Sequence, residues 1–249
     1  MLSTEYSQGS SSFRTNSAQQ REQYDNLWLA QELYRLGAIR FGDFTVGRTL
    51  HTPVYVDLRV LVGSPPTLGY AARLIRQETH AEQLRRRPTC DPFDIVAGVP
   101  FGGLHLATAY ALYNDVPLVY ARQRSSQQAV VGSDVRAGSS LPAAEEGPAI
   151  QGVFRPGQSV LVIDDLITTG GSIVDTVEIL CAAGLEVKDA VVLVDREQGG
   201  GERLKELGVR LHSILRLPIM LNLYMSSGLI DEDIYRRCVT YLEENRRRP

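Results

Sequence analysis

Lysine is almost absent from this chain. Only Lys188 and Lys205 are lysines among the 26 basic residues, so arginine carries nearly all of the positive charge. An arginine guanidinium stays protonated in proteins and cannot serve as a tunable amine. A site that needs a permanent positive charge within residues 1–187 therefore depends on arginine.

Cysteine, histidine and long apolar runs are also scarce. The three cysteines (Cys90, Cys181 and Cys238) have no metal-type spacing, and such an odd set is typical of reduced thiols in the cytosol. The four histidines are isolated from one another, which disfavours a histidine-based metal site. No apolar run is long enough to cross a bilayer, and no signal peptide opens the chain. We therefore expect a cytoplasmic protein with no membrane partner.

The charge balance excludes a further class of partner. The 26 basic residues face 29 acidic ones, a net charge of −3, so nothing predicts binding to nucleic acid or to an anionic membrane. A chain of 249 residues is long enough to bury a sizeable core.

The most informative segment is residues 160–172, which read Val-Leu-Val-Ile-Asp-Asp-Leu-Ile-Thr-Thr-Gly-Gly-Ser. The four branched apolar residues are typical of a strand buried on both faces of a parallel sheet. Asp164 and Asp165 follow where we expect that strand to end, which is where open α/β sheets bind ligands. The small residues after them predict a nest of backbone N–H groups for an anion at a helix start. The segment therefore predicts a sugar-phosphate site; the alternative is a buried strand with an ordinary acidic, glycine-rich turn.

Strand-like and helix-like segments alternate along most of the chain. We expect strands at 93–97, 117–121, 160–163 and 190–194, and helices at 104–113, 173–183 and within about 217–245. This order predicts an α/β fold with a parallel sheet and right-handed crossovers. Before it we expect a helix from 24 to 37, short strands at 41–45 and 53–58, and a helix over about 67–79 that follows a chain break at Pro65-Pro66.

Composition divides the chain into three regions. Residues 1–22 are rich in Ser, Gln, Thr and Asn, which predicts a disordered tail. Residues 23–60 form an N-terminal helix and a small hood, and residues 61–249 form the core with C-terminal helices. Within the core, the long polar stretch 123–149 predicts an active-site lid or a disordered insert.

Several segments together resemble the orotate phosphoribosyltransferases, a family of type I phosphoribosyltransferases. They are 41–45, 53–58, 98–102, 120–122, 160–172, 195–200 and the C-terminal part from Arg210 to Asn245. The 160–172 segment resembles the motif of this class that binds phosphoribosyl diphosphate (PRPP). The resemblance extends from about Leu27 to Glu244 and is closest to the orotate phosphoribosyltransferase half of UMP synthases, without the decarboxylase domain.

The resemblance implies a fold and an activity. The fold is the type I phosphoribosyltransferase fold, with a central parallel sheet flanked by helices and a small N-terminal hood. The activity is transfer of the phosphoribosyl group from PRPP to orotate, which gives orotidine 5′-monophosphate and pyrophosphate. Mg²⁺ is implied as cofactor, held mainly by substrate oxygens rather than by protein ligands. A homodimer with shared active sites is also implied.

The resemblance also implies a role for particular residues. The PRPP site would comprise Phe101, Gly102, Arg122, Asp164, Asp165, Leu166, Ile167, Thr168, Thr169, Gly170, Gly171 and Ser172. Orotate would contact Thr168, Arg196, Tyr55 and Val56, with Arg196 reading the carboxylate. Asp164, Asp165, Arg122 and Arg124 would be the catalytic residues, and Arg122 with the 123–149 stretch would reach the partner's site. For the turn at 98–103 the alternative is a plain strand-to-helix turn. For Arg196 it is an ion pair with Asp195 or Glu197.

The chain departs from the family at its cations. The positions of two loop lysines hold Gln123 and Ser126, and that of a histidine holds Gln128. The lysine of the base site aligns with Gly47, next to Arg48, and in the loop Arg124 or Arg136 are the remaining cations. Losing cations that bind transition-state charge costs orders of magnitude in rate.

Three hypotheses follow from this departure. The chain is a working orotate phosphoribosyltransferase with arginines in its lid, or an impaired relative that binds PRPP or a nucleotide in a regulatory role. The third is a phosphoribosyltransferase for another base. The segment 195–200 and the hood favour orotate over purines.

Overall fold

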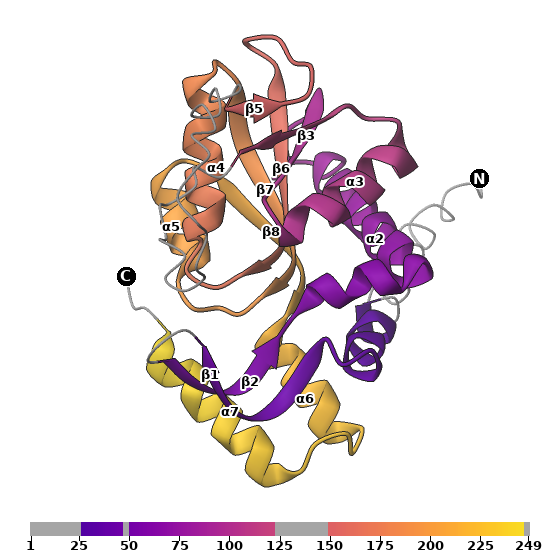
Figure 1. Ribbon diagram of the computed structural model, residues 1–249, viewed down its shortest axis with the longest axis vertical. Coiled ribbons are helices and arrows are strands. Elements are labelled where there is room, and N and C mark those ends of the chain that lie inside the picture. Colours follow the sequence, from indigo (N-terminus) through magenta and orange to yellow (C-terminus); the bar gives the residue numbers. More distant parts are fainter. Residues whose placement is uncertain (1–25, 47–49, 123–148, 247–249) are drawn as a thin grey trace, which may run out of the picture.

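The computed structural model describes residues 26–46, 50–122 and 149–246 (Figure 1). The tail expected over residues 1–22 lies outside the described residues. So do Arg124, Arg136 and the rest of the polar stretch up to residue 148, as well as Gly47 and Arg48.

A six-stranded sheet forms the centre of the molecule, with the strand order β5-β4-β3-β6-β7-β8. Its strands are β3 (Ile95–Gly98), β4 (Leu118–Ala121), β5 (Ile150–Gln151), β6 (Ser159–Ile167), β7 (Glu186–Asp195) and β8 (Arg210–Arg216). All neighbouring pairs are parallel except β4 and β5, which pair antiparallel at one edge. The predicted α/β fold with a central parallel sheet is thus confirmed.

Helices cover both faces of this sheet (Figure 1). On one face lie α2 (Pro65–Gln83) and α3 (Gly102–Asn114), and on the other lie α4 (Gly171–Ala182) and α5 (Gly200–Glu206). Successive residues of β6 alternate between the two cores, since Leu161 and Ile163 belong to one apolar cluster and Val160 and Val162 to the other. Burial on both faces is why this strand is a continuous apolar run.

The hood is built from both ends of the described chain. It contains a helix over residues 26–35, the antiparallel pair β1 (Ile39–Val46) and β2 (Leu50–Val56), and the C-terminal helices α6 (Leu217–Ser226) and α7 (Glu232–Asn245). The Tyr224 hydroxyl on α6 donates a hydrogen bond of 2.7 Å to the Ala30 carbonyl. A short 3₁₀ helix, η1 (Leu58–Gly63), connects β2 to α2.

Several elements differ from the prediction. Pro65 and Pro66 do not interrupt the chain before a helix but are the first two residues of α2, because the first helical turn needs no N–H donors. Leu58 begins η1 instead of ending a strand. The short elements β5 and α5 were not predicted, and β8 is a strand where the sequence indicated only family resemblance.

No helix among the described residues is both long enough and apolar enough to cross a membrane.

Candidate active site

The acidic pair lies on β6, inside the strand and not after its end as predicted. The pairing of β6 with β3 stops at Ile163, whereas its pairing with β7 continues to Ile167. Asp164 and Asp165 therefore occupy the stretch where β6 has a strand neighbour on one side only. The side left open by β3 is filled by the turn that leads from β3 into α3.

Glycines let this turn approach the two carboxylates. A Cβ placed on Gly103 would lie 2.5 Å from the Ile163 carbonyl oxygen and 2.8 Å from Asp164 Oδ1, and a Cβ on Gly102 would overlap the Asp165 carboxylate. The turn residue Phe101 is 74 % exposed, and its bond to Pro100 is cis. The structure thus brings Gly102, one of the predicted PRPP residues, to the acidic pair, whereas the neighbouring Phe101 side chain is exposed.

Burial makes the charge of the acidic pair costly. Asp164 is only 6 % exposed, and burial, followed by the negative charge of Asp165, raises the pKa of its carboxyl well above the ordinary value. Burial also raises the pKa of Asp165, although the hydrogen bonding of Asp164 and the nearby His105 ring partly offset it. The Asp165 N–H donates to Asp164 Oδ1 at 2.8 Å. Such a pair is stabilised by a ligand that brings hydroxyl donors or positive charge.

The loop after β6 forms a small hollow at the start of α4. Gly170 precedes the helix with a φ of 75°, and no side chain caps the first N–H groups of α4. The hollow has a volume of about 130 Å³ and is lined by Asp164, Leu166, Ile167, Thr168, Thr169, Gly170, Gly171, Ser172 and Ile173. Ile167 is itself a core residue, 1 % exposed. Uncapped N–H groups at a helix N-terminus favour an anion such as a phosphate.

The segment that follows β7 packs against this loop. The Gly200 N–H donates to the Thr168 carbonyl at 3.0 Å, and the Arg196 N–H donates to the Ile167 carbonyl at 3.1 Å. A Cβ on Gly200 would lie 2.5 Å from the Ile167 side chain, so only glycine permits this approach. The backbone thereby places Arg196 next to the hollow after β6.

The Arg196 guanidinium is buried and only partly satisfied. The residue is 8 % exposed, and its Nε and Nη2 atoms have no hydrogen-bond partner among the described residues. The neighbouring acids do not form the ion pair weighed as an alternative: Glu197 interacts with Arg216 at 3.9 Å and with Arg246 at 3.7 Å. Burial lowers the pKa of Arg196, while Tyr241 and Cys238 on α7 partly offset that effect. A carboxylate ligand would satisfy the free edge of this guanidinium.

The other two residues predicted to contact the base lie on the hood strand β2. Tyr55 is half-buried beneath Arg40, whose guanidinium carbon is 4.8 Å from the ring centroid, and it also packs against Phe44. Val56 is buried in the larger apolar core. Among the described residues, no hydrogen bond, ion pair or ring contact joins Tyr55 or Val56 to Arg196.

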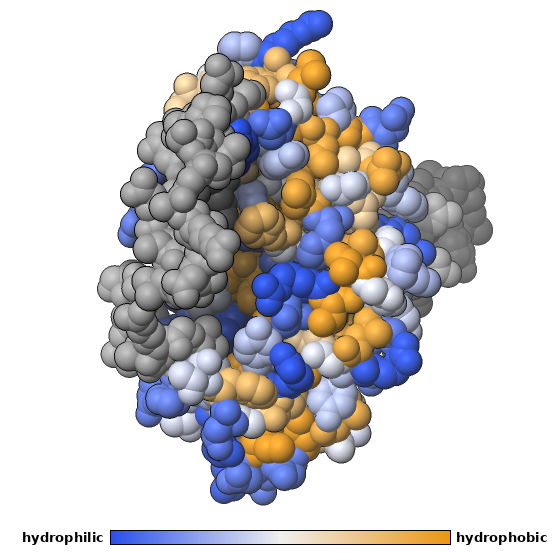
Figure 2. Space-filling view, in the orientation of Figure 1, coloured by the Kyte–Doolittle hydropathy of each residue, from blue (hydrophilic) through white to orange (hydrophobic). Residues whose placement is uncertain are grey.

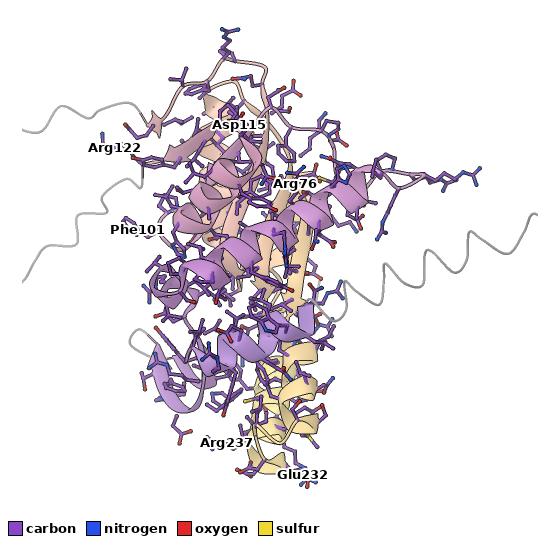
Figure 3. The ribbon with its side chains drawn as sticks, turned by 90° about the vertical axis from the view of Figure 1, so that its right-hand side faces the viewer. Arg76, Phe101, Asp115, Arg122, Glu232 and Arg237 are labelled. Atoms are coloured by element: carbon purple, nitrogen blue, oxygen red, sulfur yellow. The ribbon has the colours of Figure 1, made fainter. Side chains whose placement is uncertain are left out.

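Arg122 stands at the end of β4, where the described chain is interrupted. Figure 3 shows Arg122 and Phe101 on the same side of the molecule, both away from the hood residue Arg237. Arg122 lines a hollow of about 650 Å³ between the β3–α3 turn and α4, together with Val99, Pro100 and Ser172. The position of Arg124 lies outside the described residues.

Three residues near the site were not found from the sequence. His105 follows Gly102 by one turn of α3, and its buried Nε2 has no hydrogen-bond partner within residues 26–46, 50–122 and 149–246. Arg59 lies next to the hood, and its Nε is 2.7 Å from the Asp57 carboxylate. The pKa of Arg59 is raised mainly by Asp57, and the charge of Asp165 contributes to this increase. Tyr241 faces Arg196 from α7. None has a local motif, because tertiary contacts alone bring them to the site.

The fold and this site define a phosphoribosyltransferase. Residues 71–209, more than half of the chain, match the model of the phosphoribosyl transferase domain. The orotate phosphoribosyltransferase of Chlamydia caviae is 34 % identical over 80 % of this chain and 86 % of its own length. The chain belongs to the orotate phosphoribosyltransferase family.

Two further relatives are larger proteins. The uridine 5′-monophosphate synthase of Bos taurus is 32 % identical over 87 % of this chain. The structure of the Leishmania donovani UMP synthase superposes with a TM-score of 0.70 at 32 % identity over 88 % of this chain. The chain spans 40 % of the bovine protein and 42 % of the Leishmania one.

Proposed function

We propose that this chain transfers a phosphoribosyl group from PRPP to orotate, giving orotidine 5′-monophosphate and pyrophosphate. The observation that carries the proposal is the juxtaposition around the end of β6. A buried carboxylate pair, an uncapped helix start and a buried guanidinium with two free N–H donors meet there. These groups match ribose hydroxyls, a 5′-phosphate and a carboxylate-bearing base, in that order.

Each part of the substrates has a partner of suitable chemistry. The ribose hydroxyls donate hydrogen bonds to Asp164 and Asp165, and the 5′-phosphate accepts them from backbone N–H groups of residues 168–172. Arg196 Nε and Nη2 donate to the orotate carboxylate. Pyrophosphate leaves the anomeric carbon as the base nitrogen attacks, so the protein mainly positions the two substrates and stabilises charge.

Mg²⁺ fits the donor set of this site. Asp164 and Asp165 offer hard oxygen atoms, as Mg²⁺ requires, but two adjacent carboxylates cannot fill an octahedral shell. Most of the ligands would therefore be substrate and water oxygens. When bound, the ion neutralises negative charge on the diphosphate.

A homodimer with shared active sites is part of the proposal. Arg122 ends β4 on an exposed side of the molecule, and the stretch that follows it holds the cations Arg124 and Arg136. Figure 2 shows apolar residues gathered in several patches on one face, and Phe101 and Leu112 are among the exposed large apolar side chains. A second copy of the chain would pack on this surface. Arg122 and Arg124 of the first copy would then lie near the diphosphate bound to the second.

The proposal is tested by following orotidine 5′-monophosphate formation from PRPP, Mg²⁺ and orotate. Arg124→Ala should lower turnover by at least about tenfold, because the lid then loses one of its few cations. Arg155→Ala, which removes an exposed arginine in the loop before β6, is the matched control and should keep wild-type activity. Wild-type protein that binds PRPP in a calorimeter but forms no product would point to the impaired, regulatory relative.

The acidic pair is tested separately through ligand-dependent stability. A saturating ligand at a hundred times its Kd stabilises a folded protein by about 2.7 kcal/mol. Replacing Asp164 and Asp165 together by Asn should abolish the rise in melting temperature that PRPP causes. The exposed substitution Asp233→Asn on α7 should leave it intact. An unchanged rise in the double variant would show that the pair does not bind PRPP.

A further inference from the structure

The guanidinium of Arg196 is held between the sheet and a helix of the hood. Arg196 follows the last residue of β7, and Tyr241 and Cys238 of α7 are the groups that interact with its guanidinium. Arg196 is 8 % and Tyr241 9 % exposed, so the contact is shielded from water. Two of the three guanidinium nitrogens, Nε and Nη2, have no hydrogen-bond partner in the part of the chain that the structure describes.

The same helix also holds the residue that follows Arg196. Arg246, just after the end of α7, lies 3.7 Å from Glu197 Oε2. Glu197 has a φ of 55°, and its N–H donates to Asp195 Oδ1 at 2.7 Å. Both neighbouring carboxylates are therefore engaged elsewhere and do not compete for the free edge of Arg196.

α7 is itself anchored to the hood strand β2. The two elements pack together, and the Cys238 thiol lies 3.9 Å from the Pro53 carbonyl as a weak donor. Tyr241 thus has a fixed support on one side and the guanidinium on the other. Its hydroxyl is a neutral acceptor, which orients a guanidinium without cancelling the charge that an incoming carboxylate needs.

We propose that Tyr241 is the positioning residue of the carboxylate subsite, which rests on the proposed function. Its hydroxyl accepts a hydrogen bond from Arg196 and keeps Nε and Nη2 directed at the carboxylate of the base. A pyrimidine without that carboxylate leaves the two donors buried and unpaired, so the arrangement also selects for carboxylate-bearing bases.

The test compares Tyr241→Phe with Tyr235→Phe, two substitutions on the same helix. Tyr235 donates to Asn222 Oδ1 at 2.6 Å on the exposed side of the hood, so its variant removes a hydroxyl without touching Arg196. The dissociation constants of orotate and of PRPP are measured by calorimetry, and KM for each is measured where turnover is seen. Tyr241→Phe should weaken orotate binding about tenfold and leave PRPP binding unchanged. Tyr235→Phe should change neither.

Two results would overturn the inference while the proposed function stands. One is wild-type orotate affinity in Tyr241→Phe, and the other is an equal loss of orotate and PRPP affinity, which indicates a merely structural role. Failure of the wild-type chain to bind orotate at all would instead overturn the proposed function, and the inference with it.

Discussion

Asp164 carries its carboxyl group where a negative charge is poorly solvated. Burial and the charge of Asp165 both raise its pKa, so the ligand-free protein is less stable once this group ionises. A ligand with hydroxyl donors or a bound cation recovers that free energy. Asp164 would therefore be more stable in the proposed complex than in the free protein.

Replacing Asp164 by Asn should stabilise the ligand-free protein at neutral pH. The pKa of Asp164 is higher in the folded state than in the unfolded state. At pH values below the unfolded-state pKa, Asp164 therefore does not lower the free energy of unfolding, but it lowers it increasingly as pH rises toward the folded-state pKa. Each unit of that shift is worth about 1.4 kcal/mol. Denaturant unfolding at pH 7 should therefore show a higher free energy of unfolding for the variant, with a difference that shrinks as pH falls toward 4. A variant that is less stable at pH 7 would contradict this.

Gly103→Ala should destabilise the protein by about 1–3 kcal/mol, because a Cβ there would meet the Ile163 carbonyl and Asp164. Gly69→Ala is the control, since Gly69 lies within α2 and a Cβ there meets nothing within 4 Å. The control should be neutral or more stable by up to about 1 kcal/mol. Thermal unfolding of both variants measures the difference. Equal stabilities would mean that the turn can move away from β6.

At the scale of elements, one buried carboxylate, Asp189, connects the amino-terminal ends of β7 and β8. Asp189 on β7 accepts hydrogen bonds from Arg210 and His212 on β8 and from the Asp91 N–H. Cys90, Asp189 and His212 form the single group of metal-type ligands found among the described residues. The bidentate Arg210 already occupies both oxygens of Asp189 and repels a cation, so we assign the cluster to structure.

Asp189→Asn should cost about 2 kcal/mol of stability at pH 7, because charged donors lose their acceptor. Burial alone would raise the pKa of Asp189, but hydrogen bonds from His212, Arg210 and the Asp91 backbone lower it overall. The stabilisation by ionised Asp189 is fully present above the ordinary carboxyl pKa. It is lost as pH falls through the lower folded-state pKa of Asp189. Unfolding measured from pH 7 to pH 3 should show the two proteins converging. Glu186→Gln, at the exposed start of β7, should behave as wild type throughout.

The alternation of strands and helices could be predicted from the sequence. A strand buried on both faces of the sheet is a continuous run of apolar residues, which can be recognised locally. The segment 160–172 likewise placed the acidic pair and the loop together, since they are adjacent in the chain. The end of β6 could not be predicted, because it depends on where β3 stops and β7 continues. Tyr241 and His105 were missed for a related reason: the residues they influence, Arg196 and Asp165, are far from them in the sequence.

At the scale of the whole molecule, the first and last described elements share one packing unit. The helix over residues 26–35 lies against α6, and α7 packs on β2, so the hood closes only when both ends of the chain are in place. Arg196 and Tyr241, which form the proposed carboxylate subsite, lie at this junction. On this proposal, the base pocket forms only when the hood is complete.

The proposed shared active sites predict complementation between inactive variants. One partner carries Asp164→Asn with Asp165→Asn and lacks a pocket, and the other carries Arg124→Ala and lacks a lid cation. Each heterodimer would contain one intact site, so an equal co-expressed mixture should recover about a quarter of wild-type activity. Activity no greater than that of the separate variants, or a monomeric mass at micromolar concentration, would count against shared sites.

The chain leaves the sheet at Arg122 and returns at Ala149, and these two points are neighbours. The Arg122 N–H donates to the Ala149 carbonyl at 2.8 Å, and Ala121 pairs with Ile150. Closing a longer or shorter connection between fixed ends changes the free energy only slowly. A change in length or sequence between Arg122 and Ala149 should therefore cost the sheet little stability, so this connection can be altered without disturbing the core.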